Sequence, residues 1–249
     1  GAGTGLSGGA RPHQQGVVLG LSKMSAILEI DPENRIAKVQ PGVRNLAITQ
    51  AAQTHGLYYA PDPSSQIACS IGGNVAENAG GVHCLKYGLT VNNVLGARVV
   101  MASGEIVELG GVLYDNPGPD LLALICGSEG MLGIVTQVTV ALLPEPETKA
   151  VLLAAFSEVV QAGNAVAAII SAGIIPAGME MMDKMAVQAA EAFAKAGYPL
   201  DAEAILIIEL DGAAAELATL NTQVTDILRA YGAYQVDEAH DATQQARLW

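Results

Sequence analysis

Glycine is distributed unevenly along this chain, and the distribution limits the folds that the chain can adopt. Of the 28 glycines, 22 lie in residues 1–143 and 6 in residues 144–249. Because glycine lets the backbone turn tightly and approach other groups closely, the first part is predicted to depend on such contacts. The change occurs at residues 143–148 (Leu-Pro-Glu-Pro-Glu-Thr), where two prolines among charged residues are typical of a domain linker. The sequence therefore predicts two domains, residues 1–143 and 148–249.

The spacing of apolar residues predicts strands and helices on both sides of this linker. In the first part we expect strands at 36–40 and 136–143, a hairpin of 97–101 with 105–109, and a helix that Asn45 caps and Gly56 ends. In the second part we expect strands at 150–156 and 204–210, and helices at 158–171, 183–196 and 213–230. This alternation indicates a small α/β layer with helices on one face of a sheet.

The charge of the chain excludes several classes of partner. Asp and Glu number 25 and Lys and Arg 12, which gives a formal net charge of −13. A surface this acidic repels nucleic acid and anionic lipid, because binding to phosphate depends on clustered Lys and Arg. The chain is 51 % hydrophobic and 15 % charged, which excludes a disordered segment. No apolar run approaches the roughly 18 residues that a membrane span needs.

The cysteines and histidines carry no metal-site pattern. Cys69, Cys84 and Cys126 are odd in number and lack C-x-x-C spacing, which argues against a disulfide framework and against zinc. Buried, reduced thiols in a cytosolic protein are the favoured interpretation. The four histidines also lack ligand spacing, so no metal site is predicted. His83, next to Cys84, is interpreted as a structural histidine.

The densest glycine cluster is Gly-Ala-Gly-Thr-Gly-Leu-Ser-Gly-Gly at residues 1–9. Successive backbone N–H groups in such a run can converge on an anion, which predicts a pyrophosphate-binding loop; a flexible tail is the alternative. Residues 3–8 also match G-x-G-x-x-G, and Glu29 follows where a ribose-binding acid belongs. A Rossmann site needs a helix that starts within this motif, whereas residues 9–16 contain Pro and Gly without helical periodicity. The Rossmann interpretation is therefore rejected.

Two further clusters of small residues follow. Residues 61–65 (Pro-Asp-Pro-Ser-Ser) precede residues 70–81, which hold two Gly-Gly pairs among small residues and amides. This pattern favours backbone packed against a flat polar ligand. A long surface loop is the alternative, although structureless loops of this length are uncommon unless they are functional. Residues 127–136 predict a loop that enters a strand and can present backbone N–H and C=O groups to a ring.

In this order and spacing, the segments resemble flavoprotein oxidases of the vanillyl-alcohol oxidase type, and within them the family of bacterial glycolate oxidases and FAD-linked D-lactate dehydrogenases. The resemblance is carried by residues 1–10, 40–50, 58–93 and 124–144, and more weakly by 178–183 and 210–217. It implies an α+β fold. Residues 1–143 would form a PCMH-type FAD-binding domain of two α+β subdomains, lacking its first strands. Residues 148–249 would begin an antiparallel α/β substrate-cap domain.

The resemblance also implies FAD as the cofactor, with the first loop around the pyrophosphate. Non-covalent FAD is expected, because relatives that attach it covalently through this loop carry a His there and this loop has none. The cofactor-binding residues implied by matching motif positions are Gly1, Ala2, Gly3, Thr4, Gly5, Leu6, Ser7, Pro61, Asp62, Ser70, Gly72, Gly73, Asn74, Ala76, Asn78, Gly81, Tyr87, Gly88, Glu129, Gly133, Ile134 and Val135.

The implied activity is oxidation of a small 2-hydroxy acid by hydride transfer to flavin. Glycolate is the expected substrate; a D-lactate or D-2-hydroxyglutarate dehydrogenase, or a flavin-binding subunit without catalysis of its own, remain alternatives. The family's catalytic His-rich segment is absent and the chain opens on Gly1 within a motif, so we expect a fragment that is inactive alone. No catalytic residue is assigned to it. The implied partners are other glycolate oxidase subunits, including an iron–sulfur subunit, in the cytoplasm or peripherally at the inner membrane through those subunits.

Overall fold

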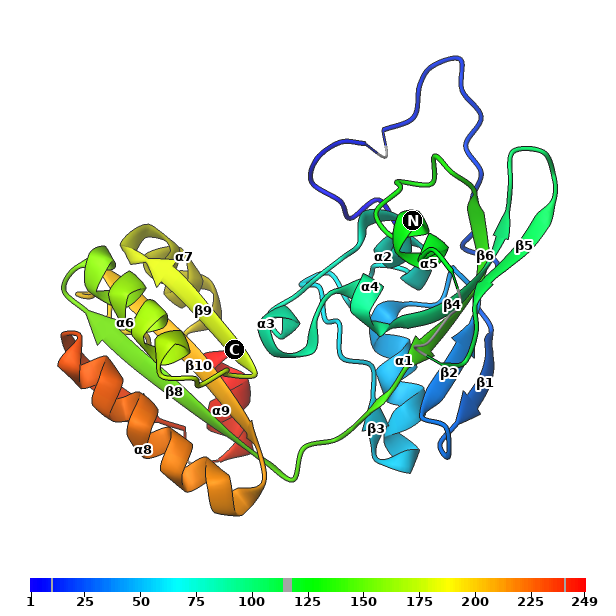
Figure 1. Ribbon diagram of the computed structural model, residues 1–249. Helices are drawn as coiled ribbons and strands as arrows, with labels where there is room; N and C mark the ends of the chain where they lie inside the picture. The colour runs from blue at the N-terminus through cyan, green and yellow to red at the C-terminus, as the bar shows by residue number, and fades with distance from the viewer. Residues whose placement is uncertain (10, 114–117, 240) are drawn as a thin grey trace. The chain divides into compact units, whose positions relative to one another are not determined.

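Two separate antiparallel sheets organise the chain, one in each of two units, Gly1–Glu145 and Pro146–Trp249 (Figure 1). The computed structural model describes residues 1–9, 11–113, 118–239 and 241–249, so Ala10 of the first motif lies outside the described residues. Helices pack on both sheets. The expected α+β class is therefore confirmed.

The sheet of the first unit has five strands in the order β1-β2-β6-β4-β5. Its strands are β1 (Ile27–Asp31), β2 (Ile36–Val39), β4 (Val94–Val100), β5 (Ile106–Gly110) and β6 (Ile134–Ala141). The expected strands and the β4–β5 hairpin are thus present, and Gly104 makes the hairpin turn with φ +85°. A two-stranded sheet of β3 (Leu57–Tyr58) and β7 (Leu143–Pro144) accompanies them.

Short helices supply the apolar residues that cover this sheet. They are α1 (Asn45–Ala52), the 3-10 turn η1 (Gln53–His55), α2 (Ile71–Glu77), α3 (Cys84–Tyr87), α4 (Thr90–Asn93) and α5 (Leu121–Ile125). Ile48 of α1, Val75 of α2 and Ile125 of α5 are buried in one core with Val99 and Val138 of the sheet. This packing fixes α2, an element on which the candidate site depends.

Two local expectations at α1 and α2 differ from the structure. Asn45 is the first helical residue and Arg44 is the N-cap, so the expectation that Asn45 caps the helix was wrong; its side chain is buried and bonded elsewhere. The expected stop is present, since Gly56 has φ +65°. Residues 71–77 form a helix although neither interpretation of that segment included one, because Ile71 and Val75 are both drawn into the core.

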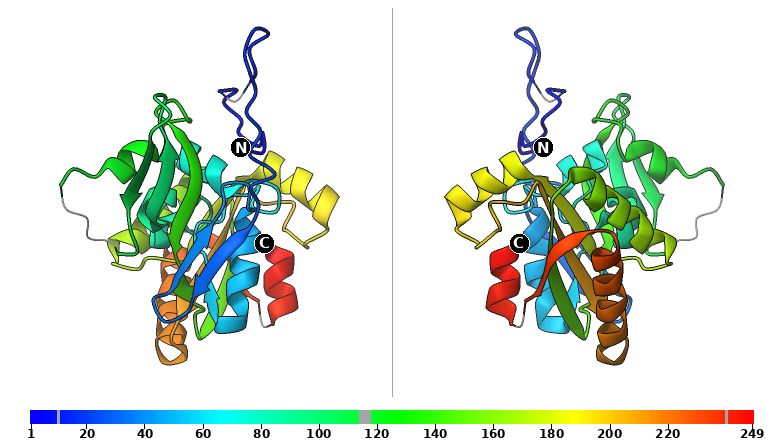
Figure 2. Two further views of the ribbon diagram at one scale, coloured as in Figure 1. Left: turned by 90° about the vertical axis from the view of Figure 1, so that its right-hand side faces the viewer. Right: turned by 90° about the vertical axis from the view of Figure 1, so that its left-hand side faces the viewer.

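The N-terminal segment, residues 1–26, contains no helix or strand in its described part. Both views of Figure 2 show it as an extended loop that leaves the rest of the first unit and returns to it. Local turns shape it, with Arg11 N donating to Gly8 O at 3.0 Å and Gly16 N to His13 O at 3.0 Å. A helix, as a Rossmann phosphate site would require, does not begin in these described residues.

The second unit is a four-stranded antiparallel sheet in the order β11-β8-β10-β9. Its strands are β8 (Thr148–Phe156), β9 (Gly178–Asp183), β10 (Ala204–Gly212) and β11 (Ala233–Glu238). Its helices are α6 (Val159–Ser171), α7 (Lys184–Ala194), α8 (Ala214–Ala230) and α9 (Ala242–Leu248). The sequence did not predict β11 and α9.

Helices cover both faces of this sheet, so the expectation of helices on one face was wrong. On one face Leu152 and Leu206 pack against α6 and α8. On the other face Val151 and Ile205 belong to a cluster that includes Val187 of α7. The physical reason is visible in β10, where every residue from Ala204 to Asp211 is buried. A strand that is apolar on both faces needs a cover on each.

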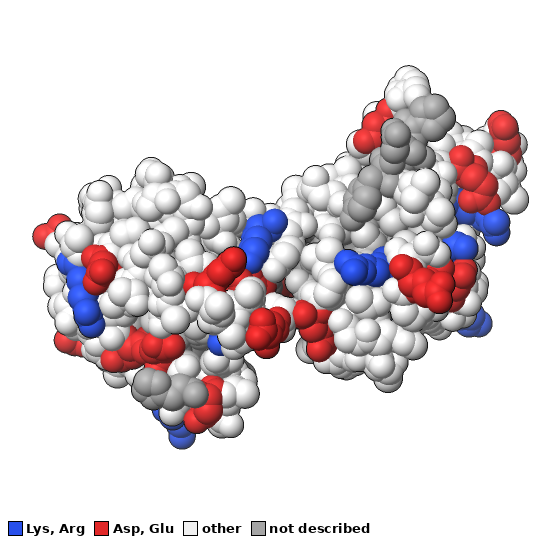
Figure 3. Space-filling model, turned by 60° about the horizontal axis from the view of Figure 1, so that its bottom comes forward, with Lys and Arg blue, Asp and Glu red and all other residues white. Residues whose placement is uncertain are grey.

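Two observations concern the charged surface and the apolar character of the helices. On the face that Figure 3 shows, Lys and Arg are scattered among Asp and Glu and form no continuous basic patch. No helix in the described ranges is both long enough and apolar enough to cross a membrane.

Candidate cofactor-binding site

The segment that precedes α1 lies beside the start of α2, and the contact between them requires glycine. Ile71 N donates to Val43 O at 2.8 Å and Gly72 N donates to Pro41 O at 2.9 Å. A Cβ atom on Gly72 would lie only 2.6 Å from Pro41 Cβ. The two segments therefore form one rigid floor, here named the α1–α2 floor (residues 41–45 and 69–73).

The N-terminal glycine loop rests on this floor. A Cβ atom on Gly1 would lie 3.2 Å from Gly73 Cα, and one on Gly73 would lie 3.2 Å from Gly1 Cα and 3.3 Å from Ser70 Oγ. Two glycines thus let backbone approach backbone where any side chain would intervene. The sequence predicted a loop in residues 1–9 and close packing in 70–81; the structure brings these two segments together.

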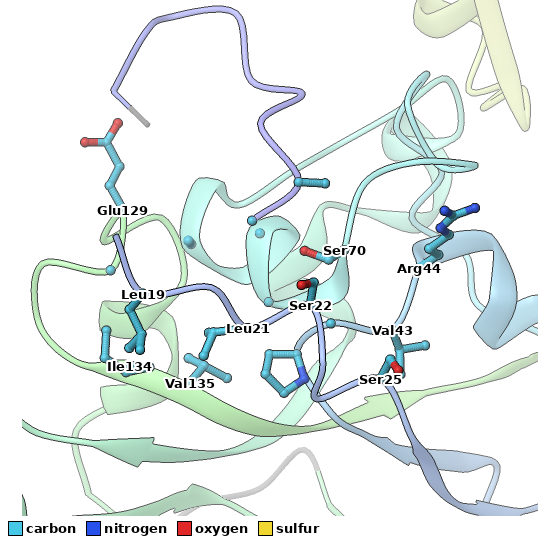
Figure 4. A pocket seen from close by; sticks show the side chains of 18 of the residues that line it. Leu19, Leu21, Ser22, Ser25, Val43, Arg44, Ser70, Glu129, Ile134 and Val135 are labelled. Atoms are coloured by element: carbon cyan, nitrogen blue, oxygen red, sulfur yellow. The ribbon is translucent and has the colours of Figure 1, made fainter. Parts of the chain in front are cut away.

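A cavity of about 670 Å³ opens over the floor (Figure 4). Figure 4 shows Leu19, Leu21, Ile134 and Val135 grouped on one side of it. Serine hydroxyls and the Arg44 side chain line the other parts. Its volume is in the range of cofactor sites, which are mostly apolar with a few oriented polar groups. The lining residues are Gly1, Ala2, Leu19, Leu21, Ser22, Ser25, Ile27, Pro41, Gly42, Val43, Arg44, Ala47, Ala68, Ser70, Gly72, Gly73, Ala76, Ile125, Ser128, Glu129, Gly130, Gly133, Ile134 and Val135.

A second cavity of about 230 Å³ lies under the glycine loop. Gly1, Ala2, Ser70, Gly73, Ala76 and Glu129 line both cavities, so the two are adjacent. Much of this second lining is glycine, which leaves backbone N–H groups accessible to an anion. Its remaining lining residues are Gly3, Thr4, Gly5, Ser7, Gly8, Gly9, Pro63, Ser65, Cys69, Asn74, Glu77 and Ala79.

Glu129 is held where the two cavities meet. Its backbone is left-handed (φ +54°), and its N–H donates to Ala76 O at 2.8 Å, while Gly127 N donates to Val75 O at 2.8 Å. The loop is thereby tied to the end of α2. A Cβ atom on Gly9 would lie 3.3 Å from Glu129 Oε1, so the carboxylate is close to the glycine loop. An acid in this place can accept hydrogen bonds from ligand hydroxyl groups.

A buried amide network supports the floor from beneath. Asn45 Nδ2 donates to Pro61 O at 2.9 Å and to Asn74 Oδ1 at 3.1 Å. Asn74 Nδ2 in turn donates to Cys69 Sγ at 3.4 Å. Asn45 and Asn74 are 1 % and 3 % exposed, so these bonds replace all contact with water. Asn74, which was expected to contact the cofactor, thus also has a structural task.

Several expected site residues line neither cavity. Leu6 is fully exposed, Pro61 and Asp62 follow β3, Asn78 is the C-cap of α2, and the remaining three lie in α3 or beside it. There they join loops to one another: Asp62 Oδ2 lies 2.6 Å from His83 Nδ1, and Val91 N donates to Asn78 Oδ1 at 2.9 Å. The expected residues outside the two cavities are Leu6, Pro61, Asp62, Asn78, Gly81, Tyr87 and Gly88.

Other lining residues were not predicted. Pro41, Val43 and Arg44 lie in a segment that carried the family resemblance, so a signal for them existed. Leu19, Leu21, Ser22 and Ser25 lie in an irregular segment without periodicity, and nothing in the sequence placed them at the site.

Two family models match the chain. Residues 1–110 match an FAD binding domain, and residues 145–249 match the C-terminal domain of FAD linked oxidases. The chain belongs to the FAD-linked oxidases. The second match begins at Glu145, the residue before the second unit of the chain.

Curated relatives agree with this membership. The chain is 59 % identical to the glycolate oxidase subunit GlcD of Escherichia coli (strain K12) over 249 residues, which is 100 % of this chain and 50 % of that relative. It is 49 % identical to GlcD of Bacillus subtilis (strain 168) over 85 % of this chain and 45 % of that relative. It is 37 % identical to the D-lactate dehydrogenase of Anaerostipes hadrus over 100 % of this chain and 54 % of that relative. The chain spans about half the length of the curated relatives it matches.

Solved structures show the same fold at low sequence identity. An alkyldihydroxyacetonephosphate synthase superposes with a TM-score of 0.84 at 23 % identity, over 99 % of this chain and 49 % of that one. A p-cresol methylhydroxylase with substrate bound superposes with a TM-score of 0.73 at 18 % identity, over 91 % of this chain and 50 % of that one. The chain therefore shares its fold with these two proteins.

The family names FAD as the cofactor, and the site suits it. The glycine-lined cavity offers backbone amides to a pyrophosphate, and the larger cavity offers an apolar wall and hydroxyl groups to a ring and sugar. Across the described part of the chain, no group of three or more His, Cys, Asp or Glu side chains is placed to hold a metal ion.

Proposed function

We propose that this chain binds FAD in an enzyme that oxidises a small 2-hydroxy acid, with glycolate, giving glyoxylate, as the substrate. The observation that carries the proposal is 59 % identity to a glycolate oxidase subunit along the whole chain. The two adjacent cavities of the first unit support it, because they provide a site of cofactor size on the residues that carry the similarity.

The proposed cofactor contacts fall into two groups. The glycine loop, Ser70 and Gly73 would hold the pyrophosphate through backbone amides and hydroxyl groups, and Gly133, Ile134 and Val135 would line the larger cavity. The proposed cofactor-binding residues that line a cavity are Gly1, Ala2, Gly3, Thr4, Gly5, Ser7, Ser70, Gly72, Gly73, Asn74, Ala76, Glu129, Gly133, Ile134 and Val135. The expected residues outside the two cavities are proposed to hold the loops around α3 and α4 in place behind the cavity lining; they are Pro61, Asp62, Asn78, Gly81, Tyr87 and Gly88.

Binding is proposed to be non-covalent. Among the described residues that line the two cavities none is His or Tyr, and the single cysteine, Cys69, is 3 % exposed with Asn74 donating to its sulfur. A flavin ring would therefore meet no accessible nucleophile in this lining.

The residues of this chain are proposed to bind and orient the cofactor. When bound, FAD supplies an acceptor for the hydride of a 2-hydroxy acid. The backbone amides of the glycine loop would hold one end of the cofactor. The apolar side chains of the larger cavity exclude water from the bound ring. No catalytic base is assigned to this chain.

We also propose the roles of the two parts: residues 1–143 as the FAD-binding domain and residues 148–249 as part of the substrate-cap domain. The matched family models support this division. Further glycolate oxidase subunits, including an iron–sulfur subunit, are the proposed partners, since the most similar relatives carry the name of a subunit. The cytoplasm is the proposed compartment, in keeping with three free cysteines.

The proposal is tested in two steps on the purified full-length protein that contains this chain. Acid denaturation should release the yellow chromophore into the supernatant as FAD; colour that stays with the precipitate would contradict non-covalent binding. Anaerobic bleaching of the flavin by glycolate, D-lactate and D-2-hydroxyglutarate then separates the substrates, and the fastest bleaching is expected with glycolate. If FAD is bound and none of the acids bleaches it, the chain is a flavin-binding part without catalysis of its own.

A further inference from the structure

Arg44 is the one Lys or Arg among the described residues that line the two cavities. The other charged lining residues are Glu77 and Glu129. The lining is therefore acidic in sum, although the proposed ligand carries a pyrophosphate. Backbone amides supply only partial positive charges. The guanidinium of Arg44 is therefore the one full positive charge that the described lining offers to an anionic ligand.

The backbone fixes Arg44 on the α1–α2 floor. Arg44 forms an isolated antiparallel bridge with Ser70. On one side of it Ile71 N donates to Val43 O at 2.8 Å, and on the other Asn45 N donates to Cys69 O at 3.1 Å. Because hydrogen bonds hold both neighbours, the start of the Arg44 side chain has a defined place opposite Ser70.

Arg44 is connected to the glycine loop through Ser70 and Gly73. Its bridge partner Ser70 lines both cavities, and Ser70 Oγ lies 3.3 Å from where a Cβ of Gly73 would be. Gly73 in turn contacts Gly1. Arg44, Ser70 and the loop thus form a continuous part of the lining.

The Arg44 side chain makes no hydrogen bond or ion pair within the described part of the chain, and it is exposed. Figure 4 shows it well apart from Glu129, the acid of the same cavity. By contrast, Lys38 and Arg98 are each paired with a carboxylate on the sheet. The donors of Arg44 are therefore available to a ligand.

We propose that Arg44 is a cofactor-binding residue whose guanidinium donates hydrogen bonds to phosphate oxygens of FAD. The proposal rests on the proposed function and adds a charge to a site otherwise built from amides and hydroxyls. A planar guanidinium donates two parallel hydrogen bonds to a phosphate group, and its charge persists at every physiological pH. In a protein of net charge −13, this local charge opposes the repulsion between protein and dinucleotide.

The test compares Arg44→Gln, Arg44→Lys and the control Arg98→Gln, which removes the same charge from a side chain outside both cavities. FAD is stripped from each protein, and the Kd for FAD and for ADP is measured at low and at high NaCl concentration. Arg44→Gln should raise both Kd values about 10- to 100-fold at low salt, the range expected for charge-assisted hydrogen bonds. Its effect should shrink at high salt, because salt screens the lost charge.

Arg44→Lys should restore part of the affinity, since it keeps the charge and loses the planar pair of donors. Arg98→Gln should bind as the unmodified protein does, and thermal unfolding should be alike in all variants. Unchanged binding by Arg44→Gln would overturn the assignment. The assignment would also be overturned if Arg44→Lys bound FAD as weakly as Arg44→Gln and if the salt dependence of binding were the same as in the unmodified protein. That result would indicate that the guanidinium stacks on the adenine. If the unmodified protein binds no FAD, the proposed function fails and the role of Arg44 with it.

Discussion

Gly1 and Gly73 lie so close together that a Cβ atom on either would be 3.2 Å from the Cα of the other. The adjacent Gly72 faces the opposite direction, where a Cβ would be 2.6 Å from Pro41 Cβ. The first contact joins α2 to a loop that is exposed and lacks regular structure, whereas the second joins α2 to the buried Pro41. Both glycines line the larger cavity; Gly73 makes room for the glycine loop, whereas Gly72 also permits a close contact that the fold requires.

Gly73→Ala is expected to weaken FAD binding without lowering stability. The new Cβ would displace the glycine loop by a few tenths of an ångström, and amides that must converge on phosphate would be misdirected. Loss of one or two such hydrogen bonds raises the Kd for FAD about tenfold or more. Alanine also favours the helix by up to about 1 kcal/mol, so thermal unfolding should occur at the same or a higher temperature.

Gly72→Ala provides the matched control. Its Cβ would overlap the buried Pro41, and overpacking of this kind costs about 1–3 kcal/mol. The expected result is a lower unfolding temperature. If Gly73→Ala and Gly72→Ala reduce stability equally, the glycine loop is part of the fold and the two glycines do not have separate roles.

Asn45→Ser distinguishes a helix cap from a buried amide. Serine is as good an N-cap as asparagine, so a capping role would make the substitution nearly neutral. In the structure Asn45 Nδ2 donates to both Pro61 O and Asn74 Oδ1 in a buried place, and serine cannot reach both acceptors. Each buried group left without a partner costs about 1–3 kcal/mol. Chemical denaturation should show a loss in this range, and Asn45→Ala should show a similar one.

The elements that the sequence predicted are those whose apolar spacing was clear. The β4–β5 hairpin, α6 and β10 lie where periodicity and turn residues placed them. The position of Asn45 was misjudged because Asn is favoured both at caps and in buried polar networks, and only the tertiary structure separates the two. The covering of both sheet faces was signalled by the five consecutive apolar residues 204–208 of β10, a run typical of a strand that is buried on both faces.

The site was predictable where glycine marks close approach of backbones. The loop at Gly1 and the pair Gly72-Gly73 were identified in this way, and they meet in the structure. The irregular segment from Leu19 to Ser25 has no period, so its contribution to the larger cavity depends on tertiary contacts alone. Arg44 lies in a motif, yet a single arginine in a motif does not show which cavity it lines.

The Asp62–His83 pair is expected to stabilise the segment around α3. Asp62 accepts twice, with Oδ2 2.6 Å from His83 Nδ1 and Oδ1 3.3 Å from His83 N. Asp62→Asn and His83→Ala should each increase amide hydrogen exchange in residues 81–93 about tenfold, while exchange in α6 serves as the internal reference. The double variant should show no further increase. Additive effects of the two substitutions would indicate that the residues act separately.

Cysteine labelling is expected to follow burial. Burial, and secondarily the charge of Asp120, raises the pKa of the Cys126 thiol to about 11. At pH 8 only about one molecule in a thousand would carry this thiolate, which is the reactive form. Cys69 is 3 % exposed, whereas Cys84 is partly exposed. Iodoacetamide should therefore label Cys84 first, as peptide mass spectrometry can show, and Cys126 should gain reactivity as the pH approaches 11. Equal rates for Cys84 and Cys126 at pH 8 would contradict this.

Substitutions at Gly163 and Gly173 measure how backbone conformation affects stability without a change in packing. A Cβ atom on either would meet no atom within 4 Å, but Gly163 lies inside α6, whereas Gly173 follows it with φ +79°. Gly163→Ala should stabilise the second unit by about 0.5–1 kcal/mol, because alanine loses less backbone freedom when the helix forms. Gly173→Ala should destabilise it by about 1–2 kcal/mol, because an L side chain is strained in the left-handed region. Trp249, the only tryptophan, lies in this unit, so its fluorescence during urea unfolding can report both changes. Shifts of the same sign in the two variants would mean that α6 does not end at this glycine in solution.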